Sequence, residues 1–455
     1  MLRKPNYKRL VILSISTLAV SLMARVFANG LEDLSTRILN QSFTQIQLDL
    51  NNDEVDEFIL GKSFFRIPWV QAPSATTARD GLGPLFSANT CVNCHAKNGR
   101  GKVFEANNIV DKSHVIRLSI LSNGTDEHQR MTAKIGFIPE PSYGAQISIN
   151  GVLGVPFEAK PLVHYSTKDI YYPDGVIVTL QKPTIKLKNL GYGDLHPNTI
   201  VSARIAPALV GLGLLEQITD AQILANEDVH DANHDGISGK ANRVWSSQIR
   251  QMEIGRYTWK ASAPTVRHQS ANAAINDMGL TNPIHEHQSC TPIQVACINA
   301  SKDGEKHELT AQRLSAISYY LTHLKLPKSI VKEHQGQRLF SEIGCSQCHV
   351  PSYSLPNTTI YPYSDFLLHD MGKGLADSRS EFDALGNEWR TPPLWRLGRA
   401  ALILKDNKNF LHDGRARNLE QAILWHGGEA EKSKTLFMNL PINSRGKILQ
   451  FLNEI

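Results

Sequence analysis

The chain of 455 residues lacks several features that would point to common classes of binding protein. It has no basic tract with interleaved aromatic residues, so a nucleic-acid partner is not indicated. It has no acidic tail that would suggest a disordered, solvated segment. Its N-terminal apolar run, 10–24, is shorter than the roughly 20 residues that a helix needs to span a bilayer. We therefore expect no integral membrane span in the mature form.

The same N-terminal segment has the layout of an export signal. A basic stretch precedes the apolar run 10–24, and Val26-Phe27-Ala28 has the small-x-small pattern of a cleavage site. The basic residues of this segment are Arg3, Lys4, Lys8, Arg9 and Arg25. We predict a signal peptide over 1–28 and a periplasmic mature protein.

An excess of charge of one sign is also lacking once this segment is removed. The formal net charge is +5, from 48 Lys and Arg residues against 43 Asp and Glu residues. Five of the basic residues and none of the acidic ones lie in 1–28, which leaves a balanced mature chain. Redox proteins or small molecules are therefore better candidate partners than polyanions.

Cysteine is scarce, but four of the six cysteines lie in two copies of one motif, 91–95 (CVNCH) and 345–349 (CSQCH). Neither copy has a second Cys pair nearby that would complete a four-cysteine zinc site. In Cys-x-x-Cys-His the thiols form thioether bonds to haem vinyl groups, and the histidine binds the iron. The sequence predicts two covalently bound haem c groups, held by Cys91, Cys94 and His95 and by Cys345, Cys348 and His349.

The remaining cysteines, Cys290 and Cys297, are close enough in sequence for a local disulfide in an oxidising compartment. A redox-active pair is the alternative, although the spacing is not Cys-x-x-Cys.

The ligand on the opposite side of each iron decides what each haem can do. A thioether there favours electron transfer, whereas an open face lets a peroxide bind. For the second haem we predict Met371, with His369 as the competing ligand and a packed core methionine as the structural alternative. For the first haem Met278 is the equivalent choice, and an open face is equally compatible with the sequence. Three other candidates follow the first motif more closely: His114, His128 and Met131.

Periodicity predicts helices around a β-containing insertion. Residues 175–180 are β-branched, 184–188 alternate, and Pro173-Asp174-Gly175 is a turn signal. The helical period returns from Leu309 and ends at Pro327. We expect a mainly α protein with two cytochrome c-like haem domains, 29–325 with a β insertion at about 115–200, and 326–455.

Six further motifs together resemble the bacterial di-haem oxidoreductase family, whose members are described as peroxidases and in some cases as thiol oxidoreductases. They are 141–146 (PSYGAQ), 211–216 (GLGLLE), 255–261 (GRYTWKA), 368–372 (LHDMG), 388–395 (EWRTPPLW) and 411–416 (LHDGRA). The C-terminal part is also similar to di-haem cytochrome c peroxidases and to the methylamine utilisation di-haem enzyme.

The resemblance implies that the second haem takes electrons from a donor and the first handles the oxidant. The donor would be a small c-type cytochrome or copper protein, and the oxidant a small molecule such as hydrogen peroxide. Peroxide cleavage needs a group that moves a proton, commonly a carboxylate with a polar neighbour. Gln146 and Glu158 are the nearest equivalents of the Gln and Glu pair of such peroxidases, although their spacing departs from that pattern. Trp245 and Trp259 are candidate bridges between the haems, with core packing as the alternative.

Residues 231–236 (DANHDG) resemble the front half of a calcium loop, with Asp231, Asn233 and Asp235 as the candidate ligands. The twelfth position is Asn242 instead of Glu, and an Asx-rich turn explains the same residues without a metal. Two other functions also stay open: a two-haem electron carrier without a catalytic site, and a di-haem oxidase of an organic or protein substrate.

Overall fold

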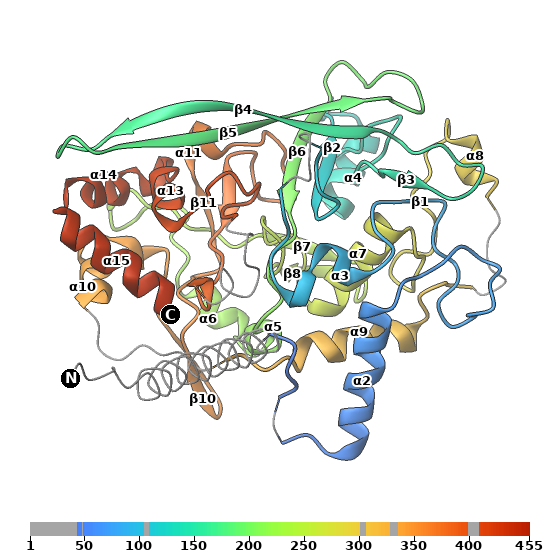
Figure 1. Ribbon diagram of the computed structural model, residues 1–455, viewed down its shortest axis with the longest axis horizontal. Coiled ribbons are helices and arrows are strands. Elements are labelled where there is room, and N and C mark those ends of the chain that lie inside the picture. Colours follow the sequence, from blue (N-terminus) through green and yellow to red (C-terminus); the bar gives the residue numbers. More distant parts are fainter. Residues whose placement is uncertain (1–42, 48, 104–108, 301–305, 328–334, 399–408) are drawn as a thin grey trace, which may run out of the picture.

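The computed structural model describes residues 43–47, 49–103, 109–300, 306–327, 335–398 and 409–455 (Figure 1). The predicted signal peptide lies outside these residues. No helix within the described part is long and apolar enough to cross a membrane.

Short runs of helices and of strands follow one another along the described chain. The helices are α2 (Asn52–Arg66), α3 (Cys91–Cys94), α4 (Asp126–Ile135), α5 (Leu212–Glu216), α6 (Asp220–Leu224), α7 (Val266–Met278), α8 (Val295–Ile298), α9 (Ala311–Thr322), α10 (Gln335–Glu342), α11 (Gly372–Leu375), α13 (Leu419–Leu424), α14 (Glu431–Asn439) and α15 (Ile442–Glu454), with 3-10 turns η1 (Ala96–Asn98), η3 (Cys345–Gln347) and η4 (Gly428–Ala430). The strands are β1 (Leu85–Phe86), β2 (His114–Ser119), β3 (Asn150–Gly151), β4 (Lys160–Tyr171), β5 (Ile177–Lys188), β6 (Ile200–Ile205), β7 (Arg243–Ser246), β8 (Gln251–Ile254), β9 (Tyr353–Leu355), β10 (Thr358–Ile360), β11 (Leu368–Asp370) and β12 (Glu388–Arg390).

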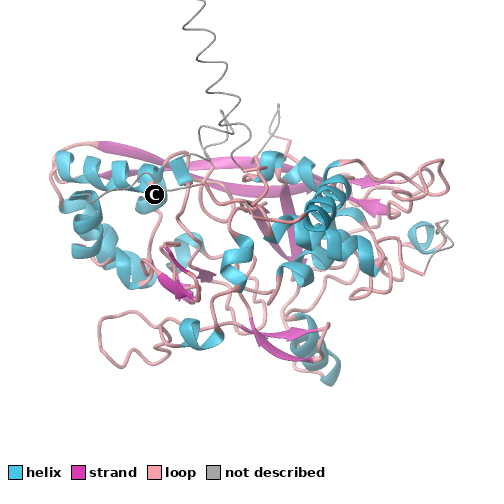
Figure 2. Cartoon of the chain, turned by 90° about the horizontal axis from the view of Figure 1, so that it is seen from below, coloured by secondary structure: helices cyan, strands magenta, loops and turns pink. Residues whose placement is uncertain are grey.

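The expectation of a mainly α protein built from two cytochrome c-like domains is wrong. The structure is 31% helix and 20% strand, close to the average mixture of a soluble domain. Its strands form two-stranded antiparallel sheets spread along the described chain, as Figure 2 shows. The expectation rested on the haem motifs, and each of these fixes only one helical turn, so they carry no information about the strands between them.

The longest pair of strands, β4 and β5, forms a hairpin that runs across the top of Figure 1. Its turn is Tyr172–Val176, where Gly175 has a φ of +85°, in the region that favours glycine. Near the base, Val163 packs in a cluster with Ile116 of β2. Near the tip, Tyr172 packs in the C-terminal cluster. The hairpin therefore contacts two separate hydrophobic clusters.

Helices α2 and α9 pack against each other behind the first Cys-x-x-Cys-His motif. Helix α2 begins with a capping box between Asn51 and Glu54. Gly61 allows the close approach, because a Cβ there would clash with the Ala316 carbonyl oxygen of α9. The ring of Tyr320 on α9 then lies 4.9 Å from that of Phe58. The helical period predicted from Leu309 is confirmed by α9.

The C-terminal cluster is built around α10 and α15. The ring of Phe340 on α10 lies 5.7 Å from that of Phe451 on α15, and both side chains are buried. Helix α15 buries Ile448, Phe451 and Leu452 in this cluster. Cys345 and Met371 pack against this cluster, which places the second motif beside it.

Candidate haem sites

The first motif begins a short helix, α3. The side chain of Thr90 caps it by accepting a hydrogen bond from the Asn93 backbone N–H. The backbone N–H of His95 donates to the Cys91 carbonyl oxygen at 2.9 Å. This single turn brings Cys91, Cys94 and His95 to one side, because residues three and four apart are neighbours on a helix.

The imidazole of His95 has its orientation and tautomer fixed by a backbone carbonyl. Its Nδ1 donates to the Pro207 carbonyl oxygen at 2.8 Å, so Nε2 is the nitrogen through which the ring would bind a metal. Burial lowers the pKa of His95 to about 4, against the weaker opposing effects of the Pro207 and Gly99 carbonyls. The ring is therefore neutral at pH 7, which is the form that binds a metal.

A cavity of about 690 Å³ opens at this motif. Cys91, Cys94 and His95 line it, together with mainly apolar side chains that include Trp259 and Met278. The volume lies within the roughly 300–1,000 Å³ that is usual for cofactor pockets. The size, the lining and the neutral imidazole of His95 all fit a haem.

The cavity wall also fits the negative charge of haem propionates. Arg390 lines the cavity, and its Nε donates to the Thr258 carbonyl oxygen at 2.8 Å. Its buried Nη1 has no partner among the described residues. A buried cationic donor without a partner is costly, so an anionic group of the ligand is its natural partner.

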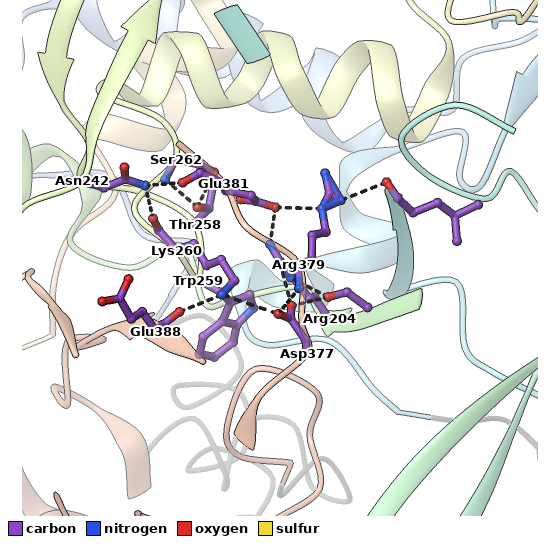
Figure 3. Close-up of polar contacts among 12 residues, drawn as sticks. Arg204, Asn242, Thr258, Trp259, Lys260, Ser262, Asp377, Arg379, Glu381 and Glu388 are labelled. Carbon is purple, nitrogen blue, oxygen red and sulfur yellow. Dashed lines mark hydrogen bonds and ion pairs between the residues drawn. The ribbon is translucent and has the colours of Figure 1, made fainter. Parts of the chain in front are cut away.

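A buried ion-pair network, drawn in Figure 3, adds Arg204, Arg379 and Glu381 to the lining of the cavity. Arg204 lies between two carboxylates, at 2.9 Å from Asp377 and 2.6 Å from Glu381. Lys260 is 3.5 Å from Asp377, and Arg379 is 3.5 Å from Glu381. Burial alone would raise the pKa of each carboxyl group, but Arg204 outweighs it and lowers both pKa values to about 2. The network therefore holds three cations against two carboxylates, an excess that favours an anionic ligand.

The second motif repeats the local geometry of the first. A 3-10 turn, η3, carries Cys345, and the backbone N–H of His349 donates to the Cys345 carbonyl oxygen at 3.0 Å. The Nδ1 of His349 donates to the Tyr363 carbonyl oxygen at 2.9 Å, and burial lowers the pKa of the ring to about 4. The ring of Phe340 lies 5.9 Å away. The second imidazole is thus neutral and oriented, and its Nε2 makes no hydrogen bond to the part of the chain that the structure describes.

The competing ligands for the second haem differ in availability. His369 lies between two carboxylates, with Nε2 2.8 Å from Asp365 and Nδ1 2.6 Å from Glu429. Burial lowers its pKa, but these partners outweigh it and raise the pKa well above the ordinary value, so the ring is protonated. Both nitrogens are occupied, which removes His369 as a ligand in this conformation. Met371 packs against the C-terminal cluster beside Cys345 and stays the prediction.

The candidates for the first haem also separate. Met278 is buried at the end of α7 and lines the large cavity. His114, His128 and Met131 are not among the described residues that line it. His268, also on α7, lines the cavity as well; it is 5% exposed and its Nδ1 has no partner among the described residues. Of the described residues that line the cavity, Met278 is thus the one methionine. The histidines besides His95 are His268, which is buried, His285 and His287.

Gln146 and Glu158, twelve positions apart in sequence, lie on the wall of a second, smaller cavity of about 30 Å³. Glu158 is buried, and its carboxylate accepts hydrogen bonds from the Ser148 backbone N–H and from Gln294 Nε2, the latter at 2.6 Å. Burial outweighs these donors and raises the pKa of Glu158 to about 7. This carboxyl group therefore gains and loses a proton near neutral pH.

Gln146 connects the small cavity to the large one. Its Nε2 donates to the Asn276 carbonyl oxygen at 3.0 Å and to Asp277 Oδ1 at 2.7 Å, and Asp277 lines the large cavity. Its Oε1 has no partner among the described residues. Four residues border both cavities: Ala145, Ile275, Asn276 and Ser289. The small cavity is thus the immediate neighbour of the candidate haem pocket.

Comparison with known families decides the classification. The family model described as "Di-haem oxidoreductase, putative peroxidase" matches residues 37–455. The chain belongs to this family. As a di-haem oxidoreductase it uses haem as its cofactor, in agreement with the two sites described above.

No curated protein matches the chain. Among solved structures, a chain of Kuenenia stuttgartiensis hydrazine synthase, from a crystal pressurised with 20 bar xenon, matches at 17% identity with a TM-score of 0.23. The match covers 38% of this di-haem oxidoreductase and 65% of the hydrazine synthase chain.

The calcium-like loop of this di-haem oxidoreductase is held by its own backbone. Asp231 accepts hydrogen bonds from the N–H groups of Asp235 and Gly236, and Asn233 accepts from Asp235. Asp235 Oδ2 accepts from Gln347 Nε2 of the second motif at 2.8 Å. These contacts match an Asx turn that braces the motif, and calcium binding stays a prediction.

Cys290 and Cys297 form a disulfide in the structure, with a Cα–Cα distance of 5.8 Å.

Of the two tryptophans singled out, Trp245 lines the large cavity under Lys134, whose Nζ is 3.0 Å from the ring centroid. Trp259 lines the same cavity and also packs against the C-terminal cluster. Only Trp259, of these two, contacts the surroundings of both motifs.

Sequence reasoning missed several polar and charged partners of the site. Asp277 directly precedes Met278, a predicted haem ligand, and Gln294 lies between the two cysteines of the disulfide. Arg390 belongs to a motif that was recognised, but nothing in the sequence showed that it faces the cavity. The contacts of Arg204 join residues 173 and 177 positions apart, and no sequence signal marks them.

Proposed function

We propose that this protein is a periplasmic di-haem peroxidase that reduces hydrogen peroxide with electrons from a small c-type cytochrome or copper protein. The observation that carries the proposal is the small cavity with Glu158 and Gln146 on its wall, directly beside the candidate pocket of the first haem. A carboxyl group that titrates near neutral pH at that place suits the proton transfer that peroxide cleavage requires. Export to the periplasm is supported by the signal pattern in 1–28.

Both haems are attached covalently in this proposal. Cys91, Cys94, Cys345 and Cys348 are free thiols on the same helical turns as His95 and His349. Burial raises the pKa of Cys91 and Cys345 to about 12, so neither is a reactive thiolate that would serve as a nucleophile. Thioether formation gives these cysteines a role that redox chemistry of the thiols does not.

Reduction of one hydrogen peroxide to two waters consumes two electrons and two protons. A bound haem supplies the iron at which the peroxide is held and reduced. Glu158 would take up a proton from one peroxide oxygen and return a proton to the other, the leaving oxygen. The small cavity has room for about one water, which would lie between Glu158 and the peroxide. Gln146 orients that water through Oε1, while its amide is held by Asp277.

Trp259 supports electron delivery between the two sites. Its ring lies between the large cavity and the cluster that contains Cys345, and its Nε1 donates to the Ile205 carbonyl oxygen at 2.8 Å. This bond holds the indole in one orientation, which favours a stable contact on both sides. The second haem would then receive electrons from the donor protein and pass them towards the first.

The test is steady-state peroxide reduction by the haem-loaded protein and its Glu158→Gln variant, with a reduced small cytochrome as donor. We expect kcat/KM for peroxide to fall by about 100-fold or more in the variant, with unchanged haem spectra. Glu216→Gln is the matched control, because burial also raises the pKa of Glu216 but its side chain lines neither cavity and its carboxylate accepts from the Val266 backbone N–H. Equal activity of Glu158→Gln and wild type would contradict the proposal.

A two-haem electron carrier is the second candidate, and the position of Met278 favours it. Its buried thioether lines the same cavity as His95, so it could fill the remaining axial position of the first haem. The carrier function predicts that peroxide leaves the first haem's spectrum unchanged in the wild type and alters it only in Met278→Ala.

A further inference from the structure

We propose that Gln294 is a positioning residue for Glu158, and that the Cys290–Cys297 disulfide holds Gln294 in place. The inference deepens the proposed function, since it rests on Glu158 as the proton-transfer group. Gln294 does not contact peroxide or haem in this account. It acts by orienting the carboxylate of Glu158 and by stabilising its deprotonated form.

The contacts of Gln294 define one orientation of its side chain. The side chain is fully buried. Its Nε2 donates to Glu158 Oε1 at 2.6 Å, and its Oε1 accepts from the Thr291 backbone N–H at 2.8 Å. A flipped amide would turn an oxygen toward the carboxylate and an NH₂ group toward an N–H, so both bonds would be lost. The NH₂ group of the Gln294 amide therefore points toward Glu158.

The loop that carries Gln294 has little packing of its own. Ile293, Val295 and Ile298 are about half exposed, and α8 has only one turn. A helix this short is not stable alone. What fixes the loop is the disulfide, whose Cys297 is buried against Leu85 and Val155. Without the cross-link, the loop loses the anchor that orients Gln294.

A further contact ties the loop to the segment that carries Gln146. The hydroxyl group of Thr291 donates to the Ser142 carbonyl oxygen at 2.9 Å. Cys290, Cys297, Gln146 and Glu158 all lie on the wall of the small cavity. The disulfide loop thus closes the side of the cavity formed by residues 288–297.

Electrostatics predicts the consequence of losing the Gln294 amide. A donor to a carboxylate favours its charged form and so opposes the effect of burial. The other titratable groups near Glu158 are Glu140, Tyr143 and Tyr192. None of them is a cation that could replace the lost donor. Removing the amide should therefore leave Glu158 protonated to higher pH.

The experiment is an infrared titration of the protonated carboxyl band on the haem-loaded full chain, with the band assigned by its loss in Glu158→Gln. Gln294→Met keeps the side-chain volume but removes the donor. We expect its midpoint to rise so that the protonation equilibrium changes roughly tenfold or more. Cys290→Ser/Cys297→Ser should also raise the midpoint of the Glu158 titration. Gln294→Asn, which keeps an amide at shorter reach, should give an intermediate shift and serves if Gln294→Met does not fold.

The control is Gln288→Met, since Gln288 lines the same small cavity and has no hydrogen bond to Glu158 among the described contacts. An unchanged midpoint in Gln294→Met, or an equal shift in Gln288→Met, would overturn the inference. The titration does not depend on catalysis. If Glu158→Gln keeps full peroxidase activity, the proposed function fails, whereas the titration still decides whether Gln294 positions Glu158.

Discussion

The side-chain amide of Gln146 donates to the carboxylate of Asp277 at 2.7 Å and thereby joins the walls of the two cavities. Gln146 is 6% exposed, and its amide is oriented by two acceptors, Asp277 and the Asn276 carbonyl oxygen. Glu158, on the wall of the same small cavity, has a pKa of about 7 and can take up a proton. Gln146 is uncharged, so it can orient a water but cannot itself take the proton. Gln146 and Glu158 should therefore act as one unit.

Coupling between these two residues is the first prediction. Gln146→Leu removes the oxygen that would orient water, and we expect kcat/KM for peroxide to fall about tenfold or more. The double variant with Glu158→Gln should be little worse than Glu158→Gln alone, because groups that act together are not additive. Steady-state kinetics of the four proteins measures this. Independent, multiplying effects would show that the two residues do not share a step.

Haem content gives the second prediction. Cys91→Ser/Cys94→Ser and Cys345→Ser/Cys348→Ser should each lose one of the two covalently bound haems, because a serine oxygen does not form the thioether. Haem staining of the denatured chain and a pyridine haemochrome assay measure the ratio of haem to protein. Cys290→Ser/Cys297→Ser is the matched control and should keep both haems. Loss of haem in the control, or its retention in either motif variant, would contradict the assignment.

Local motifs were predictable from the sequence because their geometry spans only a few residues. Each Cys-x-x-Cys-His motif needs one helical turn, and α3 and η3 supply it. The turn at Pro173-Asp174-Gly175 follows from the same kind of short-range chemistry, and the β4–β5 register confirms it. The glycines that follow Met278 and Met371 have positive φ, +63° at Gly279 and +73° at Gly372, as a helix end or tight turn requires.

The overall fold and the charged wall of the first site were not predictable in this way. Helical period is a local property, and it did not reveal how many short strands pair between distant segments. The partners of Arg204 and the shared boundary of the two cavities depend on contacts between residues more than a hundred positions apart. Gln146 and Glu158 were found only through family resemblance, and the structure adds the small cavity that gives them a common role.

The third prediction concerns Met371 as the ligand of the second haem. Met371→Ala should convert that haem from low to high spin, since no thioether would remain at its position. Optical and electron paramagnetic resonance spectra measure the spin state, and Met438→Ala, another methionine that packs against the C-terminal cluster, is the control. An unchanged low-spin spectrum would exclude Met371. It would point to His426, whose Nδ1 donates to the Ala422 carbonyl oxygen at 2.7 Å and whose pKa is lowered by burial.

The fourth prediction is a pH dependence of stability at Glu158. Burial raises its pKa from 4.5 to about 7, so between these values the folded chain keeps a proton that the unfolded chain has lost. Stability therefore falls as pH rises across this window, by up to about 3 kcal/mol, and is unaffected by this group below it. Glu158→Gln does not titrate, so its free energy of unfolding relative to the wild type should improve from pH 4.5 to pH 7. A constant difference between the two proteins would show that the carboxyl group has an ordinary pKa.

The most direct test of the account is electron paramagnetic resonance with optical spectroscopy on the haem-loaded protein, fully oxidised and half-reduced, with and without hydrogen peroxide. The account predicts two distinguishable haems. The second keeps its low-spin spectrum throughout, and the first changes when peroxide is added to the half-reduced protein. Two six-coordinate low-spin haems that ignore peroxide in both states would contradict a peroxidase and would identify this di-haem oxidoreductase as an electron carrier.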